Sequence, residues 1–194
     1  MAKIENFEKY HKEYEVWFEK NEELYEDELN SIKRLVASAK NGLEIGVGSG
    51  RFALPLGIKV GLEPSSSMAN IAKQKGIKVY KGVAESLPFE DETFDFAIMV
   101  TTVCFVDDMT NSFKEAYRVI KRGGFFIVGY VDRDSKLGKE YAKRKEKSKF
   151  YSNATFYTTD EVKDALKEAG FKDFEIEYVK KTENSFIFLK ALKV

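Results

Sequence analysis

Hydrophobic residues gather in short runs along the middle of the chain, and polar or charged residues separate these runs. Five runs are rich in β-branched residues and nearly continuous, as in strands that are covered on both faces. These runs are Leu43–Val47, Ile58–Leu62, Ile77–Tyr80, Phe94–Val100 and Phe125–Tyr130. Helical patterns at Ser66–Lys75 and Met109–Ile120 lie between them. Strands that alternate with helices predict parallel crossover connections and a doubly wound α/β sheet.

The two ends of the chain follow other patterns. The N-terminal part is dense in Glu, Lys, Leu and aromatic residues, and it predicts two helices, about 7–20 and 22–40. Near the C-terminus, a helix at Thr159–Ala169 precedes two strand-like segments within 173–192, which predict an antiparallel hairpin. The expected fold is therefore a mixed sheet of seven strands in a single domain over residues 1–194.

The composition disfavours several classes of protein. Lys plus Arg and Asp plus Glu both count 32, so the formal net charge is zero, whereas a nucleic-acid binder usually carries a basic excess. Cys104 is the only cysteine, which excludes an internal disulfide and a multi-cysteine metal site, and no metal is predicted. No apolar run approaches the ~20 residues of a membrane span, and the N-terminus lacks the apolar core of a signal peptide. We therefore expect a cytoplasmic protein.

The stretch LEIGVGSGRF places glycines at alternate positions, where the first predicted strand ends. Gly46, Gly48 and Gly50 follow Glu44. In an open parallel sheet such a turn lies at the carboxyl edge, where ligands bind. Glycine lets the backbone take positive φ and lets a ligand approach without meeting a Cβ atom. The glycines could also serve only to make tight turns, but three in this position favour a ligand-binding loop.

The spacing of this loop argues against a dinucleotide. The dinucleotide fingerprint needs a glycine three residues after its second one, and Arg51 stands there. No Lys-Ser/Thr pair follows, as a P-loop would require. The next acidic residue, Glu63, ends the second predicted strand, where a carboxylate can accept hydrogen bonds from both hydroxyls of a ribose. These features predict a nucleoside ligand without a pyrophosphate.

Five segments in this order resemble the class I S-adenosylmethionine-dependent methyltransferases, in their small-molecule, UbiE-like (methyltransferase type 11) branch. The segments are Glu44–Gly50, the acid Glu63, Gly82–Val100, Glu115–Gly129 and residues 158–171. The resemblance implies a Rossmann-like sheet in the order 3-2-1-4-5-7-6 with the last strand antiparallel, an N-terminal helical cap at 1–40, and S-adenosylmethionine as the cofactor.

The resemblance also implies which residues bind the cofactor. Glu44 would organise the loop and contact the amino group, and Glu63 would hold the ribose. Ala84 would offer its backbone N–H to the adenine, with Glu85 near the exocyclic amine. Met68 would lie against the adenine, although ordinary helix packing is an equal alternative. The full implied set is Glu44, Gly46, Gly48, Gly50, Glu63, Pro64, Met68, Ala84, Glu85 and Thr101.

The resemblance implies that the N-terminal helices and an insertion at 131–157 cover the cofactor and the acceptor. Tyr10, Tyr14 and Trp17 fall on one helical face, so they either contact the substrate or pack the cap onto the core. Two charged runs, acidic over 13–28 and basic over 133–149, predict solvated helix faces.

Candidates for the chemistry are few. His11, the only histidine, and Tyr14 are the possible catalytic groups. Cys104 either walls the pocket or is a small buried hydrophobe. The predicted function is methyl transfer from S-adenosylmethionine to a small molecule. Two alternatives stay open: a non-catalytic cofactor-binding or regulatory module on the same fold, and a methyltransferase acting on RNA or protein. The sequence does not determine whether N, O, S or C is methylated, or the oligomeric state.

Overall fold

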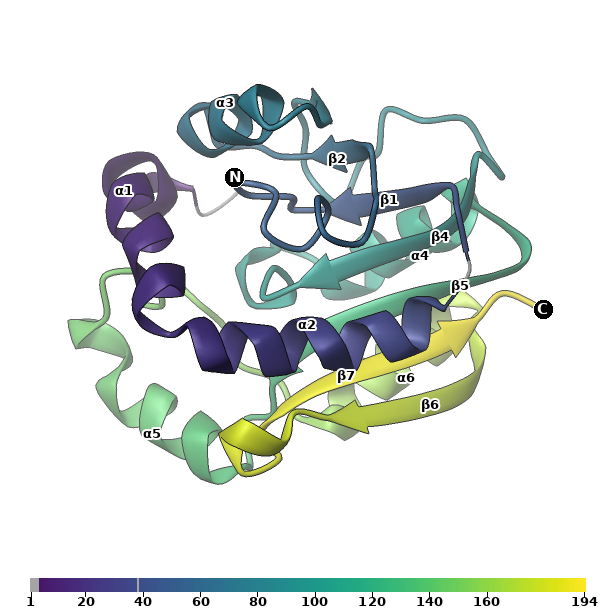
Figure 1. Ribbon diagram of the computed structural model, residues 1–194. Helices are drawn as coiled ribbons and strands as arrows, with labels where there is room; N and C mark the ends of the chain where they lie inside the picture. Colours follow the sequence, from purple (N-terminus) through teal and green to yellow (C-terminus); the bar gives the residue numbers. More distant parts are fainter. Residues whose placement is uncertain (1–3, 38) are drawn as a thin grey trace.

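The computed structural model describes residues 4–37 and 39–194, in which seven strands form one twisted sheet (Figure 1). The strand order is β3-β2-β1-β4-β5-β7-β6, as predicted. The first five strands run parallel, and β7 is antiparallel to both of its neighbours, β5 and β6. The strands are β1 (Gly42–Ile45), β2 (Val60–Leu62), β3 (Lys78–Tyr80), β4 (Phe94–Val100), β5 (Ile120–Val131), β6 (Lys172–Tyr178) and β7 (Phe186–Leu192).

Helices cover both faces of the sheet, and Figure 1 shows α2 in front of it with α4 and α6 behind. The α-helices are α1 (Glu5–Lys20), α2 (Glu22–Val36), α3 (Ser66–Gln74), α4 (Met109–Val119), α5 (Lys136–Arg144) and α6 (Thr159–Ala169). Short 3-10 helices are η1 (Val103–Phe105), η2 (Lys145–Lys147) and η3 (Lys180–Thr182). No helix among the described residues combines the length and apolar composition needed to cross a membrane.

Side chains of the central strands alternate between two apolar layers, because successive residues of a strand point to opposite faces. In β4, Ala97 and Met99 join the layer under α4 and α6, whereas Phe96 and Ile98 join the layer under α2. All four side chains are at most 1% exposed. Burial on both faces explains why these strands appear in the sequence as continuous apolar runs.

The N-terminal helices occupy two different places. Helix α2 packs on the sheet through Ile32, Leu35 and Val36, whereas α1 crosses the edge where the parallel strands end (Figure 1). The two helices meet at Asn21, which leaves the helical conformation with φ −120° and ψ 37°. Of the predicted cap, α1 alone lies at that edge, and Met1, Ala2, Lys3 and Ser38 lie outside the described residues. The division of the chain into a cap, a core and an insertion stays a prediction.

Two carboxylates of α1 hold the helix at this edge. Glu8 accepts a hydrogen bond from the Ser67 hydroxyl at 2.6 Å, beside the N-terminus of α3, where a negative charge is favoured. Glu15 pairs with Arg51 at 2.7 Å and with Lys75 at 3.3 Å. The position of α1 therefore depends on charges contributed by the glycine loop and by α3.

Candidate functional site

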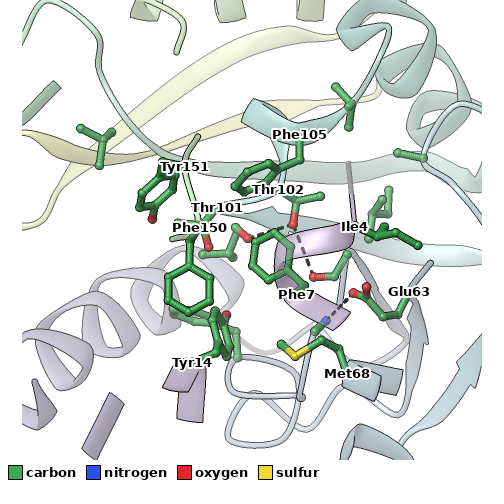
Figure 2. A pocket seen from close by; sticks show the side chains of 18 of the residues that line it. Ile4, Phe7, Tyr14, Glu63, Met68, Thr101, Thr102, Phe105, Phe150 and Tyr151 are labelled. Atoms are coloured by element: carbon green, nitrogen blue, oxygen red, sulfur yellow. Dashed lines mark hydrogen bonds between the residues drawn. The ribbon is translucent and has the colours of Figure 1, made fainter. Parts of the chain in front are cut away.

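A cavity of about 190 Å³ lies at the carboxyl ends of β1, β2 and β4, beneath α1 (Figure 2). Ten of the residues predicted to form the site line it: Tyr14, Trp17, Gly46, Gly48, Glu63, Pro64, Met68, Ala84, Glu85 and Thr101. Five others do not: Tyr10, His11, Glu44, Gly50 and Cys104. The topology therefore gathers residues from the N-terminal helix and from the ends of three strands around one space.

The three glycines of the loop differ in what a Cβ atom at each position would contact. All take positive φ, at +75° for Gly46, +52° for Gly48 and +82° for Gly50. A Cβ on Gly50 would lie 2.4 Å from Ile77 Cδ1, so this glycine is needed for packing. A Cβ on Gly48 would lie 3.4 Å from Met68 Cε, and both residues line the cavity. Tight packing therefore accounts for Gly50, whereas Gly48 leaves room at the cavity wall.

Glu63 connects the end of β2 to the glycine loop. Its Oε2 accepts a hydrogen bond from the Gly48 N–H at 2.8 Å (Figure 2), and its Oε1 accepts one from the Ser65 N–H at 2.9 Å. Burial raises the pKa of Glu63 to about 7, although the two N–H donors favour its charged form. A carboxylate can accept about four hydrogen bonds, so Glu63 keeps lone pairs for a ligand in the cavity.

Glu44 lies beneath the loop, outside the cavity wall. It is 2% exposed, and its Oε2 has no hydrogen-bond partner among the described residues. Burial raises the pKa of Glu44 well above the usual range, against the hydrogen bond that the Ala53 N–H donates to it. Its predicted contact with a ligand amino group stays a prediction, and the unpaired oxygen is a free acceptor for such a group.

Glu85 is engaged with the protein itself. Its Oε1 accepts hydrogen bonds from the backbone N–H groups of Asp107, at 2.7 Å, and Asp108, at 3.2 Å. The side chain therefore ties the loop after β3 to the start of α4. Its neighbour Ala84 is 6% exposed and lines the cavity. The predicted contact of Glu85 with an exocyclic amine stays a prediction.

Further aromatic side chains, which the sequence did not single out, line the cavity around Tyr14. Phe7 packs edge-to-face on Tyr14, with ring centroids 6.0 Å apart, and on Phe105, at 5.0 Å. Phe150 lies 5.9 Å from Tyr14, and Tyr151 stacks on Phe105 at 6.0 Å (Figure 2). Phe7 and Tyr14 are seven residues apart, so their spacing on one helix could have indicated a shared face. Nothing local indicates their partners, which come from β4–α4 and from the predicted insertion.

The candidate catalytic groups are placed differently. Burial raises the pKa of the Tyr14 hydroxyl, and the carboxylates of Glu44 and Glu63 raise it further, so Tyr14 stays protonated near neutrality. Tyr14 is therefore suited to donate a hydrogen bond and not to accept a proton. His11 does not line the cavity, and its Nδ1 lies 3.0 Å from the carbonyl oxygen of Glu8 on the same helix.

The predicted common face of Tyr10, Tyr14 and Trp17 stays a prediction, although Tyr10 and Tyr14 both pack against Phe150. Tyr10 takes a non-helical conformation, with φ −112° and ψ 24°, so α1 is kinked there and the regular spacing is lost. The Tyr10 ring packs beside Phe150, with centroids 6.4 Å apart. Trp17 lines the cavity but is 38% exposed, at its rim. Cys104 is 7% exposed and lines a separate small hollow beyond Thr101.

Glu28 of α2 also lines the cavity, and the prediction of a solvated acidic face was wrong for this residue. Its side chain is 6% exposed. Burial, and then the charge of Asp27, raises the pKa of Glu28 to about 8. The sequence could have indicated this burial, because Glu28 lies four residues before Ile32 and seven before Leu35, on the buried stripe of the helix.

The buried carboxyls predict how stability depends on pH. Glu28, Glu44 and Glu63 all have pKa values raised above 4.5 in the fold, mainly by burial. Between pH 4.5 and about 8 the folded state therefore binds more protons than the unfolded chain, so the free energy of unfolding falls as the pH rises. Carboxylates with lowered pKa, such as Glu8 and Glu15, change stability only in more acidic solution. We expect the midpoint of thermal unfolding, measured by calorimetry without ligand, to decrease from pH 5 to pH 8.

A matched variant measures how much Glu28 contributes to this pH dependence of stability. Glu28→Gln removes one titrating group without changing the shape of the side chain, so its melting temperature should decrease less steeply over the same range. A wild-type melting temperature that stays level or rises between pH 5 and pH 8 would contradict the raised pKa values.

A family model and a solved structure that resemble this chain are both described as methyltransferases. A family model described as "Methyltransferase domain" matches residues 43–128. A crystal structure from Thermotoga maritima is described as an S-adenosylmethionine-dependent methyltransferase and possible histamine N-methyltransferase. It superposes with a TM-score of 0.92 at 46% sequence identity, over 98% of this chain and 100% of that one.

Two sequence relatives extend the comparison. An uncharacterised protein of Methanocaldococcus jannaschii is 48% identical over 169 residues, which are 87% of this chain and 82% of that protein. A demethylmenaquinone methyltransferase of Staphylococcus epidermidis is 29% identical over 137 residues, which are 58% of this chain and 57% of that enzyme.

Proposed function

The chain belongs to the family of S-adenosylmethionine-dependent methyltransferases, and on that basis we propose that it methylates a small molecule bound in the cavity beneath α1. The predicted family, fold and cofactor are thereby confirmed. The observation that carries the proposal is the cavity itself, which aromatic side chains from distant parts of the chain close off. A cavity lined mainly by apolar and aromatic side chains suits a small molecule better than a folded RNA or a protein surface.

The residues of the cavity fit S-adenosylmethionine. Glu63, at the end of β2, presents a carboxyl group for the ribose hydroxyls. Gly48 leaves a wall without a Cβ atom, next to Met68. Ala84 lies on the adenine side and Thr101 on the methionine side in this proposal. Glu44 lies beneath the loop and not in the cavity wall, and its role in this proposal is to organise the loop, with its unpaired Oε2 as the candidate acceptor for the amino group of the cofactor.

The chemistry asks mainly for positioning. When bound, S-adenosylmethionine supplies a methyl group on a positively charged sulfur. A lone pair of the acceptor forms the new bond to the methyl carbon, and the sulfur keeps the electron pair of the sulfur–carbon bond that breaks. The side chains of Phe7, Tyr14 and Phe150 exclude water from this region. Aromatic faces also favour a nearby cation, so the same rings can stabilise the charged sulfur.

The acceptor side of the cavity has its own wall, which we call the acceptor chamber. It is formed by Leu24, Glu28, Leu137, Tyr141, Tyr151 and Phe186. These residues come from α2, α5, the segment after η2, and β7, none of which belongs to the glycine loop. The small-molecule names of the Thermotoga and Staphylococcus relatives support an acceptor of this kind.

Binding and turnover together test the proposal. Titration calorimetry should show micromolar-range binding of S-adenosylmethionine and of its demethylated product, and no binding of nicotinamide dinucleotides. Small amines, phenols, thiols and acids should then be assayed for release of S-adenosylhomocysteine, and we expect release well above background with at least one class. Cofactor binding without turnover in every class would favour the non-catalytic module. Salt-sensitive RNA binding through residues 133–149 would favour an RNA methyltransferase.

A further inference from the structure

Glu28 is a buried carboxyl group without a partner among the residues that the structure describes. It is 6% exposed, and none of the hydrogen bonds or ion pairs among the described residues involves its carboxyl. Burying such a group without a hydrogen bond costs free energy, so folded proteins rarely keep one unless it has a use. Because Glu28 lines the acceptor chamber, a ligand in that chamber can supply the missing donor.

Within residues 4–37 and 39–194, the titratable groups whose charges interact with Glu28 are tyrosines and one acid. Burial raises the pKa values of Tyr14, Tyr141 and Tyr151, and the charge of Glu28 raises all three further. The nearby Asp27 is itself acidic. Tyr25, on the same helix, also has its pKa raised, mainly by burial and in small part by Glu28. Glu28 therefore lies among aromatic rings and hydroxyls, a setting that favours a bound cation.

Contacts with the C-terminal hairpin fix the position of Glu28. Asp27 Oδ2 accepts a hydrogen bond from the backbone N–H of Lys181 at 2.9 Å, and Lys181 Nζ pairs with Glu23 at 2.6 Å. On the other side of the hairpin, the Leu137 N–H donates to Ser185 Oγ at 3.3 Å. These contacts hold α2 and α5 on the same hairpin, so the two helices form opposite parts of one chamber.

We propose that the methyl acceptor is an amine and that Glu28 binds its ammonium group and takes a proton from it before methyl transfer. The inference rests on the proposed function and names its substrate class. An ammonium group brings the positive charge that the chamber lacks, and its N–H groups can donate to the unpaired carboxyl of Glu28. An alcohol, a thiol or a carboxylic acid brings no positive charge, and an ionised acid would be repelled.

The proton transfer balances in a simple way. One N–H bond of the ammonium breaks, an O–H bond forms on Glu28, and the electron pair stays on nitrogen as the lone pair that attack requires. The pKa of Glu28, raised to about 8 by burial, approaches that of an alkylamine at about 10, so the neutral pair is accessible in the chamber. After methylation Glu28 keeps the proton that it took, and this proton leaves to solvent when the next ammonium group binds and restores the carboxylate.

Binding measurements test the inference without relying on turnover. The probes are 2-phenylethylamine, tryptamine and histamine, each paired with the alcohol of the same skeleton and titrated with saturating S-adenosylhomocysteine. We expect the wild-type protein to bind at least one amine about tenfold or more tightly than its alcohol, because of the charge-assisted hydrogen bond. Glu28→Gln should abolish this preference. Glu26→Gln, an exposed glutamate of the same helix, should retain it.

Two further readouts exclude a merely structural role for Glu28. Both variants should bind S-adenosylhomocysteine within about twofold of the wild-type affinity, because Glu28 lies outside the cofactor loop. At pH 7 Glu28 is largely protonated, so amine binding to the wild-type protein should release a proton. Calorimetry in buffers of different ionisation enthalpy measures that proton, and Glu28→Gln should not release it.

The outcomes separate this inference from the proposed function. Equal binding of every amine and its alcohol, or an amine preference that survives in Glu28→Gln, overturns the role of Glu28. Turnover of a phenol, thiol or acid with no amine bound would refute the amine while leaving small-molecule methylation intact. Glu28-dependent amine binding without methyl transfer to any acceptor would support the site and refute the enzymatic function.

Discussion

Replacing Glu63 with alanine is expected to weaken the binding of S-adenosylmethionine by about 100-fold, since charge-assisted hydrogen bonds to buried carboxylates contribute ~1.5–3 kcal/mol each. The carboxyl has two functions that the substitution removes together. It accepts the N–H groups of Gly48 and Ser65, which shape the glycine loop, and it presents its remaining lone pairs to the cavity. Titration calorimetry with S-adenosylmethionine measures the loss.

A control carboxylate lies at the opposite edge of the same sheet. Asp95, near the start of β4, pairs with Lys121 at 2.8 Å and lines no part of the cavity. Asp95→Asn should leave the cofactor affinity within about twofold of wild type, because the two sites share no contacts. An unchanged affinity in Glu63→Ala would show that Glu63 does not bind the ribose.

Replacing Gly46 with alanine should lower the cofactor affinity by about 100-fold or more, because the new methyl group would clash with Thr102. Its Cβ would lie 2.3 Å from Thr102 Oγ1 and 2.4 Å from Thr102 Cγ2. Both residues line the cavity, so relief of the clash must displace the loop, the end of β4, or both. The affinity from calorimetry and the melting temperature without ligand should both fall.

A second glycine supplies a matched control for backbone strain. Gly57 has φ +71°, close to the +75° of Gly46, but a Cβ there would meet nothing within 4 Å. Both alanine variants therefore carry the cost of positive φ, about 1 kcal/mol, and only Gly46→Ala also carries the clash. Gly57→Ala should lower the melting temperature modestly and keep the cofactor affinity within about twofold of wild type.

A double variant tests the cause of the Gly46 effect. Adding Thr102→Gly to Gly46→Ala removes the atoms that the new methyl group would meet, so part of the cofactor affinity should return. Equal losses in Gly46→Ala and Gly57→Ala, or no recovery in the double variant, would show that backbone strain and not the contact with Thr102 is responsible.

The sequence predicted the parts of the site that depend on one strand and the turn that follows it. Glu63 and the glycine loop belong to this kind, because strand ends and glycines leave local patterns. Within the loop, however, the sequence could not separate the roles of the glycines. Gly50 packs against Ile77, and Gly46 packs against Thr102, some 56 residues further along the chain. Only the folded arrangement shows that Gly48 is the glycine that borders the cavity without such a close contact.

The residues on the acceptor side show more clearly that local sequence patterns do not predict contacts between distant segments. Phe7 and Phe150 are 143 residues apart in the sequence, yet the centroids of their rings lie 5.8 Å apart. The expected face of Tyr10, Tyr14 and Trp17 assumed a regular helix, whereas α1 is kinked at Tyr10. A backbone kink in a helix that packs against several elements is decided by those contacts, which the helical period does not contain.

The sequence by itself determined the order and type of the elements, the mixed seven-stranded sheet and the cofactor, because hydrophobic period, turn residues and motif order are properties of neighbouring residues. The tertiary structure alone decided which charged side chains are buried. In an acidic run that includes Glu23, Glu26 and Glu28, the first two side chains are exposed and the third is buried in the cavity wall. The difference arises because α2 lies on the sheet with one stripe inward, and α5 and the C-terminal hairpin then close over the same stripe. Burial depends on what packs from elsewhere, so it is a property of the fold and not of the run of residues.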